Sequence, residues 1–207
     1  MADIQDTVRE IKQSFRLLMN GVTAQSMRDK GLDYHINWGA SLPHLKEMAQ
    51  EYPQDKSLAI ELWKADIREC KILATMLMPK DDFSMDLAML WIEQTRTQEI
   101  AEIATMFLYQ YMPYAGSMAL MLIAKEESMM QLHGFTILSR LFAKGELPED
   151  TRDINEFLDQ AMVALQSENI SIKHSAWNAV SHFANCDDLC LAAAKNALKS
   201  IKMDEWL

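Results

Sequence analysis

Glycine, proline and cysteine are scarce in this sequence, and their scarcity excludes several classes of protein. Six glycines and five prolines in 207 residues are too few for an all-β protein with many turns. Three cysteines, Cys70, Cys186 and Cys190, lack the spacing of a disulfide framework, so we expect reduced thiols in a cytoplasmic protein. No run of about 18 uncharged apolar residues occurs, so no membrane-spanning segment is expected.

Positive charge is also in short supply. Lysine and arginine together number 20 against 30 acidic residues, which gives a formal net charge of −10. Neutralisation of phosphates supplies most non-specific affinity for nucleic acids, so this balance disfavours a nucleic-acid-binding protein. A local basic stripe can nevertheless bind DNA while the rest of the surface is acidic.

Helical periodicity dominates the sequence, and it is clearest between Trp38 and Pro79. Ser41, Asp55 and Asp66 are suitable N-caps for three successive helices in this stretch. Apolar residues recur at helical spacing in each: Leu45, Met48, Ala49 and Tyr52; then Leu58, Ala59, Leu62 and Trp63; then Ile67, Cys70, Leu73, Ala74 and Leu77. This pattern predicts a helical hairpin preceded by its own entry helix.

The hairpin pattern repeats along the chain. The segments that contain Ala74, Ala104 and Thr136 resemble one another at a period of about 30 residues. Further helices are predicted to start at Ser84, Ser117, Asn169 or Ser171, and Asp187 or Asp188. A single hairpin cannot bury its apolar face alone, so the repeats must stack. We therefore predict an all-α superhelix, a solenoid of stacked HEAT-like hairpins with a concave face, as one domain over residues 1–207.

Two features allow either a packing role or a binding role. The irregular stretch Leu32–Ala40 carries Tyr34, His35 and Trp38, which either form a binding loop or cover the open end of the first hairpin. The sixteen methionines either fill the core or form an adaptable surface for a partner.

Metal and cofactor signatures are weak. His182, Cys186 and Cys190 are spaced by four residues and would share one face of a continuous helix, as metal ligands can. However, Asn185 and the aspartates after it predict a helix break, and a fourth ligand is missing. No nucleotide-binding, zinc-protease or nucleophile-elbow motif is present, so we expect neither a metal nor a cofactor.

One group of motifs resembles a known family. The matching residues are Trp38-Gly39-Ala40, Pro43, Leu45, Lys46, Met48 and Ala49, then Leu58-Ala59 and Leu62-Trp63, then Ile67-Arg68-Glu69. Over roughly residues 35–112 the chain is similar to the DNA alkylation repair family, the HEAT-like-repeat alkylpurine DNA glycosylases. The resemblance implies a protein that acts on duplex DNA and hydrolyses the N-glycosidic bond of N3- or N7-alkylated purines.

The resemblance also implies candidate site residues. Glu102 falls at the position of the family's catalytic aspartate, while Gln98 stands where an aromatic residue is expected. Trp177 matches a tryptophan that stacks on the deoxyribose. The simpler interpretation of Glu102 is an exposed helical carboxylate, and that of Trp177 is core packing.

The positive charge expected on a DNA-binding surface is reduced in this sequence. His133-Gly134 stands where the family has paired arginines. The remaining candidates for DNA contact are Arg68, Lys71, Lys173, Lys195 and Lys199, unless these are ordinary solvated charges. The alternative function is therefore a non-catalytic helical-repeat scaffold whose concave face binds a protein or peptide.

Overall fold

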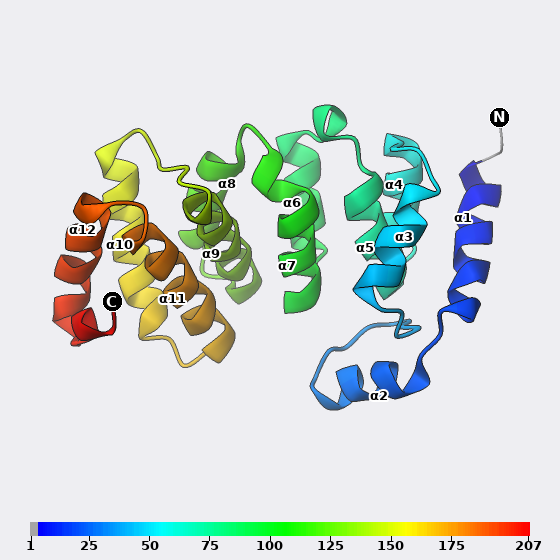
Figure 1. Ribbon diagram of the computed structural model, residues 1–207, viewed down its shortest axis with the longest axis horizontal. Helices are drawn as coiled ribbons and strands as arrows, with labels where there is room; N and C mark the ends of the chain where they lie inside the picture. The colour runs from blue at the N-terminus through cyan, green and yellow to red at the C-terminus, as the bar shows by residue number, and fades with distance from the viewer. Residues whose placement is uncertain (1–3) are drawn as a thin grey trace. The chain divides into compact units, whose positions relative to one another are not determined.

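The computed structural model describes residues 4–207, apart from the side chain of Trp206, and confirms the all-α prediction (Figure 1). The α-helices are α1 (Ile4–Ser14), α2 (Gly21–Asp29), α3 (Leu42–Gln50), α4 (Lys56–Lys64), α5 (Arg68–Leu77), α6 (Met85–Glu93), α7 (Gln98–Phe107), α8 (Ala115–Ile123), α9 (Ser128–Ala143), α10 (Thr151–Leu165), α11 (Ile170–Ala184) and α12 (Asp188–Leu198). Short 3-10 helices are η1 (Phe15–Leu17), η2 (Lys80–Asp82), η3 (Tyr109–Tyr111), η4 (Lys199–Ile201) and η5 (Asp204–Trp206). None of these helices is long and apolar enough to cross a membrane.

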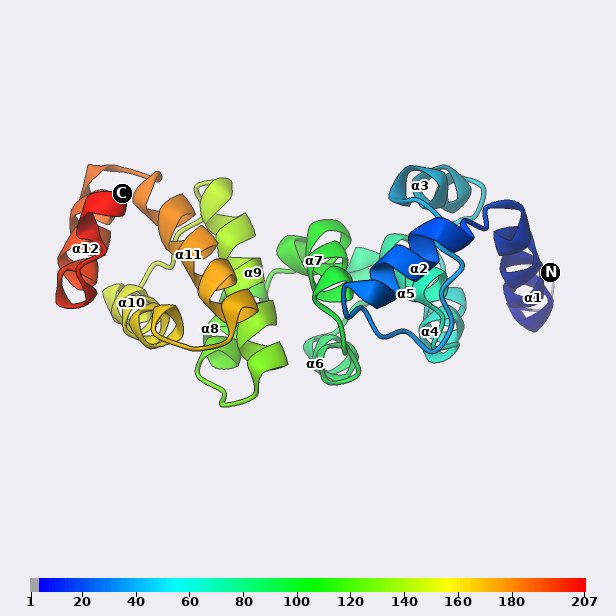
Figure 2. The same cartoon turned by 90° about the horizontal axis from the view of Figure 1, so that it is seen from below.

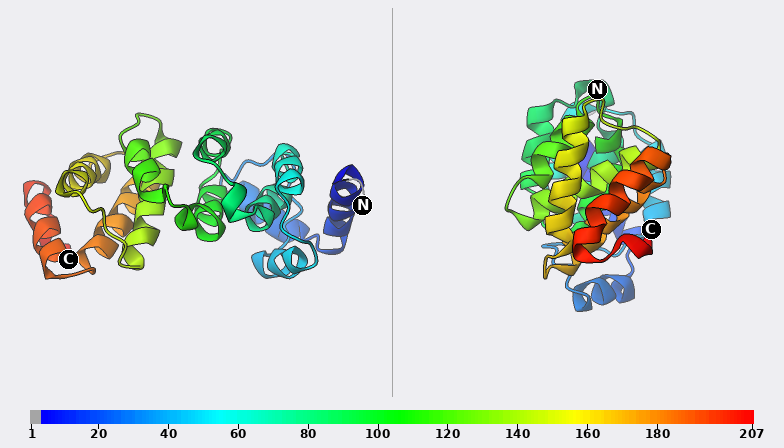
Figure 3. Two further views of the ribbon diagram at one scale, coloured as in Figure 1. Left: turned by 90° about the horizontal axis from the view of Figure 1, so that it is seen from above. Right: turned by 90° about the vertical axis from the view of Figure 1, so that its left-hand side faces the viewer.

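The described chain divides into two compact units, and the boundary between them along the sequence falls within α6. The first runs up to Ala88 and contains α1 to α5, and the second runs from Met89 and contains α7 to α12. In Figure 3 the chain of the second unit ends with α10, α11 and α12, coloured from yellow through orange to red, and these three helices contact one another. That residues 1–207 form a single domain stays a prediction.

Most of the predicted helix starts are confirmed by capping hydrogen bonds. Ser41, Asp55, Ser84, Asn169 and Asp187 accept backbone N–H groups from the first turns of α3, α4, α6, α11 and α12. These bonds satisfy N–H groups that have no partner within a helix. The short polar residue ahead of these five helices was therefore a reliable signal. The predicted start at Ser117 is wrong, because α8 begins at Ala115, after Tyr114, which makes no side-chain capping bond.

The predicted cap at Asp66 is wrong. Asp66 has a left-handed backbone (φ 49°), and the N-cap of α5 is Ile67, whose side chain makes no capping bond. Ile67 is instead extended and forms an isolated parallel bridge with Ile36, and the Arg68 N–H donates to the Ile36 carbonyl over 3.0 Å. Pairing with the preceding loop therefore moves the helix start past the reach of Asp66.

The loop before α3 is fixed to α5 by a buried glutamate. Glu69 is fully buried, and its carboxylate accepts the N–H groups of Trp38 (3.2 Å) and Ala40 (3.3 Å). Arg68, only 3% exposed, donates through Nη1 to the same carboxylate over 3.0 Å and to the Ala40 carbonyl over 2.9 Å. The two matching motifs of the sequence, Trp38-Gly39-Ala40 and Ile67-Arg68-Glu69, are thus halves of one internal network.

Gly39 completes this network because no other residue fits there. Its backbone is left-handed (φ 72°), and a Cβ atom would lie 2.2 Å from the carbonyl oxygen of Asn20. The Asn20 N–H in turn donates to the Trp38 carbonyl over 2.9 Å. This end of the loop is therefore held on both sides. His35 is exposed and Tyr34 is half-buried, so the role of these two side chains stays a prediction.

The second unit consists of stacked helical hairpins, as predicted. Helix α9 packs against its hairpin partner α8 and against α11 of the next hairpin, and Figure 2 shows α9 and α11 side by side. Phe142, Phe157 and Phe183, from α9, α10 and α11, meet edge to face with ring centroids 4.9–5.5 Å apart. Such aromatic contacts stabilise the core beyond the apolar area that they bury.

The methionines only partly match the core-filler prediction. Met48, Met78, Met112 and Met118 are buried, Met19 and Met121 are exposed, and most of the others are half-buried. Met1 lies outside the described residues.

Gly134 allows α9 to approach α8 closely, and we expect Gly134→Ala to destabilise the protein by about 2 kcal/mol through overpacking. A Cβ atom there would lie 2.6 Å from Ile123 Cγ2 and 2.8 Å from the Ala119 carbonyl oxygen. Gly116→Ala is the matched control, because its nearest neighbour would be Leu141 Cδ1 at 3.9 Å. Urea denaturation should show a lower midpoint for Gly134→Ala and an equal or higher one for Gly116→Ala. Equal midpoints for the two variants would mean that α8 moves aside at no cost.

Candidate functional site

A cleft of about 270 Å³ in the second unit is lined by the second helices of three successive hairpins. The lining residues are Gln98, Glu102 and Met106 from α7; Thr136, Ser139 and Arg140 from α9; and His174, Ser175, Asn178 and His182 from α11. All of them belong to one compact unit, so the cleft is formed within it.

The polar lining residues recur at intervals of four along their helices. Gln98 and Glu102 are one turn apart in α7, as are Thr136 and Arg140 in α9. In α11, His174, Asn178 and His182 continue the same spacing over two turns. Residues four apart lie on one helical face, so each helix presents a polar stripe to the cleft, while most of its apolar residues are buried.

Hydrogen bonds order several of these side chains. Gln98 donates through Nε2 to Glu102 Oε1 over 2.7 Å. Ser139 Oγ lies 2.9 Å from His182 Nδ1 and so joins α9 to α11, whereas Asn178 Nδ2 lies 3.4 Å from His174 Nδ1 within α11. These contacts limit the rotamers of the groups that face the cleft.

The cleft differs from the rest of the protein in its charge. Neither α9 nor α11 contains an aspartate or a glutamate, and their charged residues are Arg140 and Lys173. Glu102 is the one carboxylate among the described residues that line the cleft. Helix α10, by contrast, carries Asp153 and two further acidic residues. The net charge of −10 is thus unevenly distributed, and two of the three helices that form the cleft are free of negative charge.

Glu102 is the predicted residue that the structure places in the cleft. Trp177 is half-buried on α11 and is not among the lining residues, so its stacking role stays a prediction. Lys173 is exposed in the first turn of α11, Lys195 is half-buried on α12, and Lys199 is exposed at the end of α12; none of them lines the cleft.

The prediction that Arg68 contacts DNA is inconsistent with its position. Its guanidinium is buried in the first unit and is held by Glu69 and the Ala40 carbonyl, so a phosphate cannot reach it in this conformation. Lys71 is also largely enclosed: its side chain is 11% exposed, with Nζ 4.6 Å from the centre of the Trp63 ring and 3.6 Å from Asp66 Oδ1. Helical spacing alone did not show which faces of α5 are covered.

His133 and Gly134 likewise lie in the interior and not on an exposed surface. His133 is fully buried, with its ring 5.8 Å from that of Tyr109, and Gly134 faces α8. The identity of these two interior residues therefore gives no information about the charge of a DNA-binding surface. Arg140, two turns later on α9, supplies a cation to the cleft.

The His182, Cys186 and Cys190 pattern does not form a continuous helical face. Helix α11 ends at Ala184 and α12 begins at Asp188, as the expected break predicts. Within residues 4–207, no group of three or more histidine, cysteine and acidic side chains is arranged to hold a metal ion. Burial raises the pKa of Cys190 to about 11 and that of Cys70 to about 12, which makes both thiols poor nucleophiles.

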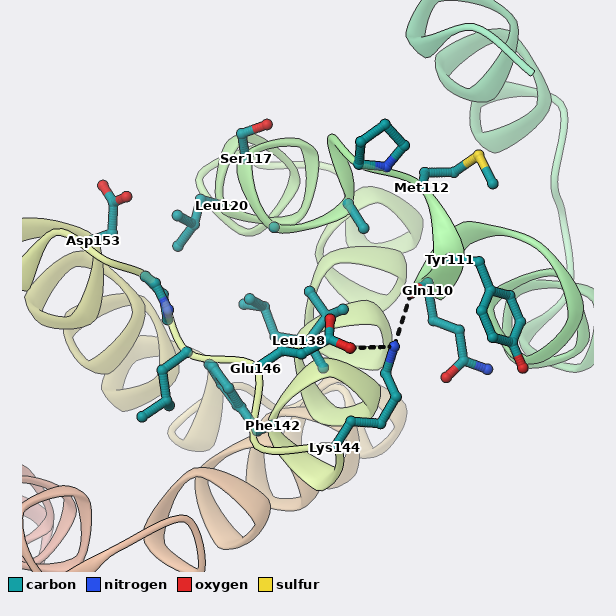
Figure 4. Close-up of a pocket in the computed structure, with 16 residues that line it drawn as sticks. Gln110, Tyr111, Met112, Ser117, Leu120, Leu138, Phe142, Lys144, Glu146 and Asp153 are labelled. Atoms are coloured by element: carbon teal, nitrogen blue, oxygen red, sulfur yellow. Dashed lines mark hydrogen bonds and ion pairs between the residues drawn. The ribbon is translucent and has the colours of Figure 1, made fainter. Parts of the chain in front are cut away.

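A second cavity, of about 510 Å³, lies between η3, α8, the end of α9 and the start of α10 (Figure 4). Its lining includes apolar side chains such as Leu138 and Phe142. Lys144 donates to the Gln110 carbonyl over 3.0 Å and pairs with Glu146 over 2.8 Å. This ammonium is thus already bound on two sides, and the cavity contains none of the predicted site residues.

The chain matches a known protein family over most of its length. A family described as "DNA alkylation repair enzyme" matches residues 11–160 of the 207. The chain belongs to this family. The match covers all of the first unit's helices from the end of α1 onward, and it continues through α7 and α9 of the cleft.

A solved structure has the same fold as this family member. It is described as "A new family of proteins related to the HEAT-like repeat DNA glycosylases with affinity for branched DNA structures". The TM-score is 0.80 at 15% identity, and the alignment covers 93% of this chain and 82% of that one. No curated protein matches the sequence. This likeness establishes the fold, the HEAT-like repeat arrangement that the sequence predicts.

Several cleft residues were missed by the sequence analysis. Arg140, His174, Asn178 and His182 were not among its candidates for DNA contact. The available signal was the polar spacing of four on α9 and α11, two helices that lack carboxylates. It was not used because nothing in the sequence shows that these two stripes face the same space.

Proposed function

We propose that this protein binds duplex DNA at the cleft of α7, α9 and α11 and hydrolyses the N-glycosidic bond of cationic alkylpurines there. The observation that carries the proposal is the position of Glu102: it is the one carboxylate among the described lining residues, opposite helices without negative charge. Membership of the DNA alkylation repair family supports the same function.

Local charge permits DNA binding in spite of the acidic composition. DNA is attracted by the potential near the contact surface, which nearby cations dominate at physiological salt because charges beyond about 10 Å are screened. Arg140 and Lys173 are the charged residues of α9 and α11, and His174 and His182 add two polar rings to the lining. The acidic side chains of α10 are not among the residues that line this cleft.

The chemistry requires little more than a well-placed carboxylate. A purine alkylated at N3 or N7 carries a positive charge and is already a good leaving group, so no strong general acid is needed. As the base departs, positive charge develops on the sugar, and a carboxylate directed at it stabilises the transition state. The Gln98 amide, which donates to Glu102 over 2.7 Å, orients that carboxylate and leaves its second oxygen available to the sugar or to a water molecule.

Glu102→Gln tests the catalytic assignment, and we expect it to slow the release of methylated purines from methylated duplex DNA by about 100-fold or more. The amide preserves the shape of the side chain and removes its charge. Glu99→Gln is the matched control, since it makes the same change on α7 at a residue that does not line the cleft. Released bases are measured by chromatography. Equal release by the wild type and Glu102→Gln would remove Glu102 from the mechanism.

Binding of branched DNA without base excision is the second candidate function. It is favoured by the fold shared with the solved structure, whose description includes affinity for branched DNA. Tighter binding to a four-way junction than to duplex, together with no base release by the wild type, would support it. If neither DNA binds even at low salt, the remaining hypothesis is the scaffold that binds a protein or peptide.

A further inference from the structure

We propose that Ser139, His182 and Arg140 form a site for one phosphate group of the DNA backbone, in which Ser139 positions the imidazole of His182. This inference rests on the proposed DNA-binding role of the cleft and identifies the groups that hold the backbone. Ser139 and Arg140 are neighbours in α9, and His182 comes from α11. All three line the cleft that contains Glu102.

The contact between Ser139 and His182 determines which ring nitrogen faces the cleft. Ser139 is 8% exposed, and His182 Nδ1, at 2.9 Å from its Oγ, is its hydrogen-bond partner. A buried hydroxyl stays satisfied by donating its proton, and no other acceptor within residues 4–207 engages this one. The hydroxyl therefore donates to Nδ1, and the neutral ring carries its own proton on Nε2.

The Nε2–H group is then an available donor. The His182 side chain is exposed, and Nε2 makes no hydrogen bond to any described residue. A second contact fixes the same junction of helices: Cys186 Sγ lies 3.3 Å from the Phe142 carbonyl oxygen at the end of α9. The imidazole is thus oriented before a ligand arrives, which lowers the entropic cost of binding.

Arg140 adds a charged donor to the same cleft. Its side chain is exposed, and its guanidinium forms no ion pair or hydrogen bond with the part of the chain that the structure describes. Guanidinium presents paired N–H donors that match the oxygens of a phosphate. An arginine that is not neutralised by a neighbouring carboxylate retains its full charge for an anion.

The charges around this group of donors favour an anion. Across the cleft, α7 contributes Glu102, which already accepts a hydrogen bond from Gln98. Helices α9 and α11 contribute no carboxylate. Arg140 and the Nε2–H group of His182 are both donors, so the anionic oxygens of a phosphodiester satisfy these two groups.

The test is DNA binding by fluorescence anisotropy at about pH 8.5, where histidine is normally neutral, from about 20 to 200 mM salt. Ser139→Ala and His182→Ala should each weaken binding about tenfold, the effect of one hydrogen bond to a charged group. Both substitutions cost the site the same uncharged donor, the Nε2–H group of His182, so the slope of affinity against salt should not change. For the same reason the double variant should bind DNA like either single variant. Arg140→Gln should lower that slope by about one phosphate contact.

Rescue of DNA affinity by a second hydroxyl residue distinguishes a positioning role of Ser139 from a purely structural one. Ser139→Thr keeps the hydroxyl and should restore wild-type affinity, whereas Ser139→Ala should not, although both are expected to keep the wild-type circular dichroism spectrum. Ser139→Ala binding DNA as tightly as the wild type would overturn the proposal. So would additive losses in the double variant, because they would show that the two side chains act independently.

The outcome is independent of the excision assay. If no base is released but binding depends on Ser139 and His182 as described, the catalytic proposal fails and the phosphate site stands. If base release is normal and these variants bind like the wild type, the phosphate site fails alone. Retention of a polyglutamate peptide with the same dependence, by a protein that ignores DNA, would replace the phosphate with an acidic peptide and overturn the proposal.

Discussion

Glu69→Gln is expected to lower the free energy of unfolding by about 3–5 kcal/mol, the usual effect of removing one partner of a buried ion pair. Glu69 is fully buried and accepts N–H groups from Trp38, Ala40 and Arg68. Glutamine replaces one accepting oxygen with an NH₂ group, which would face donors only. It also removes the negative charge that Glu69 places 3.0 Å from the Arg68 guanidinium, which is only 3% exposed.

Urea unfolding followed by tryptophan fluorescence measures this effect. Glu61→Gln is the matched control, since Glu61 makes a comparable ion pair with Lys64 at the surface, and such pairs contribute little. The control should unfold at the wild-type urea concentration, whereas Glu69→Gln should unfold at a clearly lower one. Coincident curves for the two variants would show that the loop of residues 32–40 does not depend on this network.

Acid is expected to destabilise the protein through His133. Burial lowers the pKa of this side chain to about 3, from an ordinary value of 6.5, because its ring is fully enclosed and neither nitrogen is hydrogen-bonded within the described chain. Between these two values the unfolded chain binds a proton that the native protein does not bind. Stability therefore falls with decreasing pH below 6.5, by about 1.4 kcal/mol per pH unit, or about 3 kcal/mol at pH 4.5.

His133→Leu should remove this part of the acid sensitivity. Leucine fills a similar volume without a group that must be desolvated or protonated. The loss of unfolding free energy between pH 7.5 and pH 4.5 should be about 3 kcal/mol smaller in this variant than in the wild type. His174→Gln is the control, because it removes an exposed histidine instead of a buried one. An identical pH dependence in His133→Leu and the wild type would show that the buried ring is not responsible.

The sequence by itself determined the local structure of this protein. Caps such as Ser41, Asp55 and Asp187, and the apolar stripes that follow them, were enough to predict the helices and their pairing in hairpins. These signals are reliable because they act within a few residues along the chain. The family motifs were visible for the same reason, since the residues that match lie in short segments.

Only the tertiary structure decided what those motifs do. Arg68 and Glu69 look like surface charges in the sequence, but they form the buried attachment of a loop that begins more than 25 residues earlier. Glu102 could be found from its motif, whereas Arg140 and His182 could not. The role that we propose for them depends on α9 and α11 packing side by side, with Ser139 Oγ 2.9 Å from His182 Nδ1. Helical periodicity tells which residues share a face, and packing between helices decides whether that face is buried or lines a cleft.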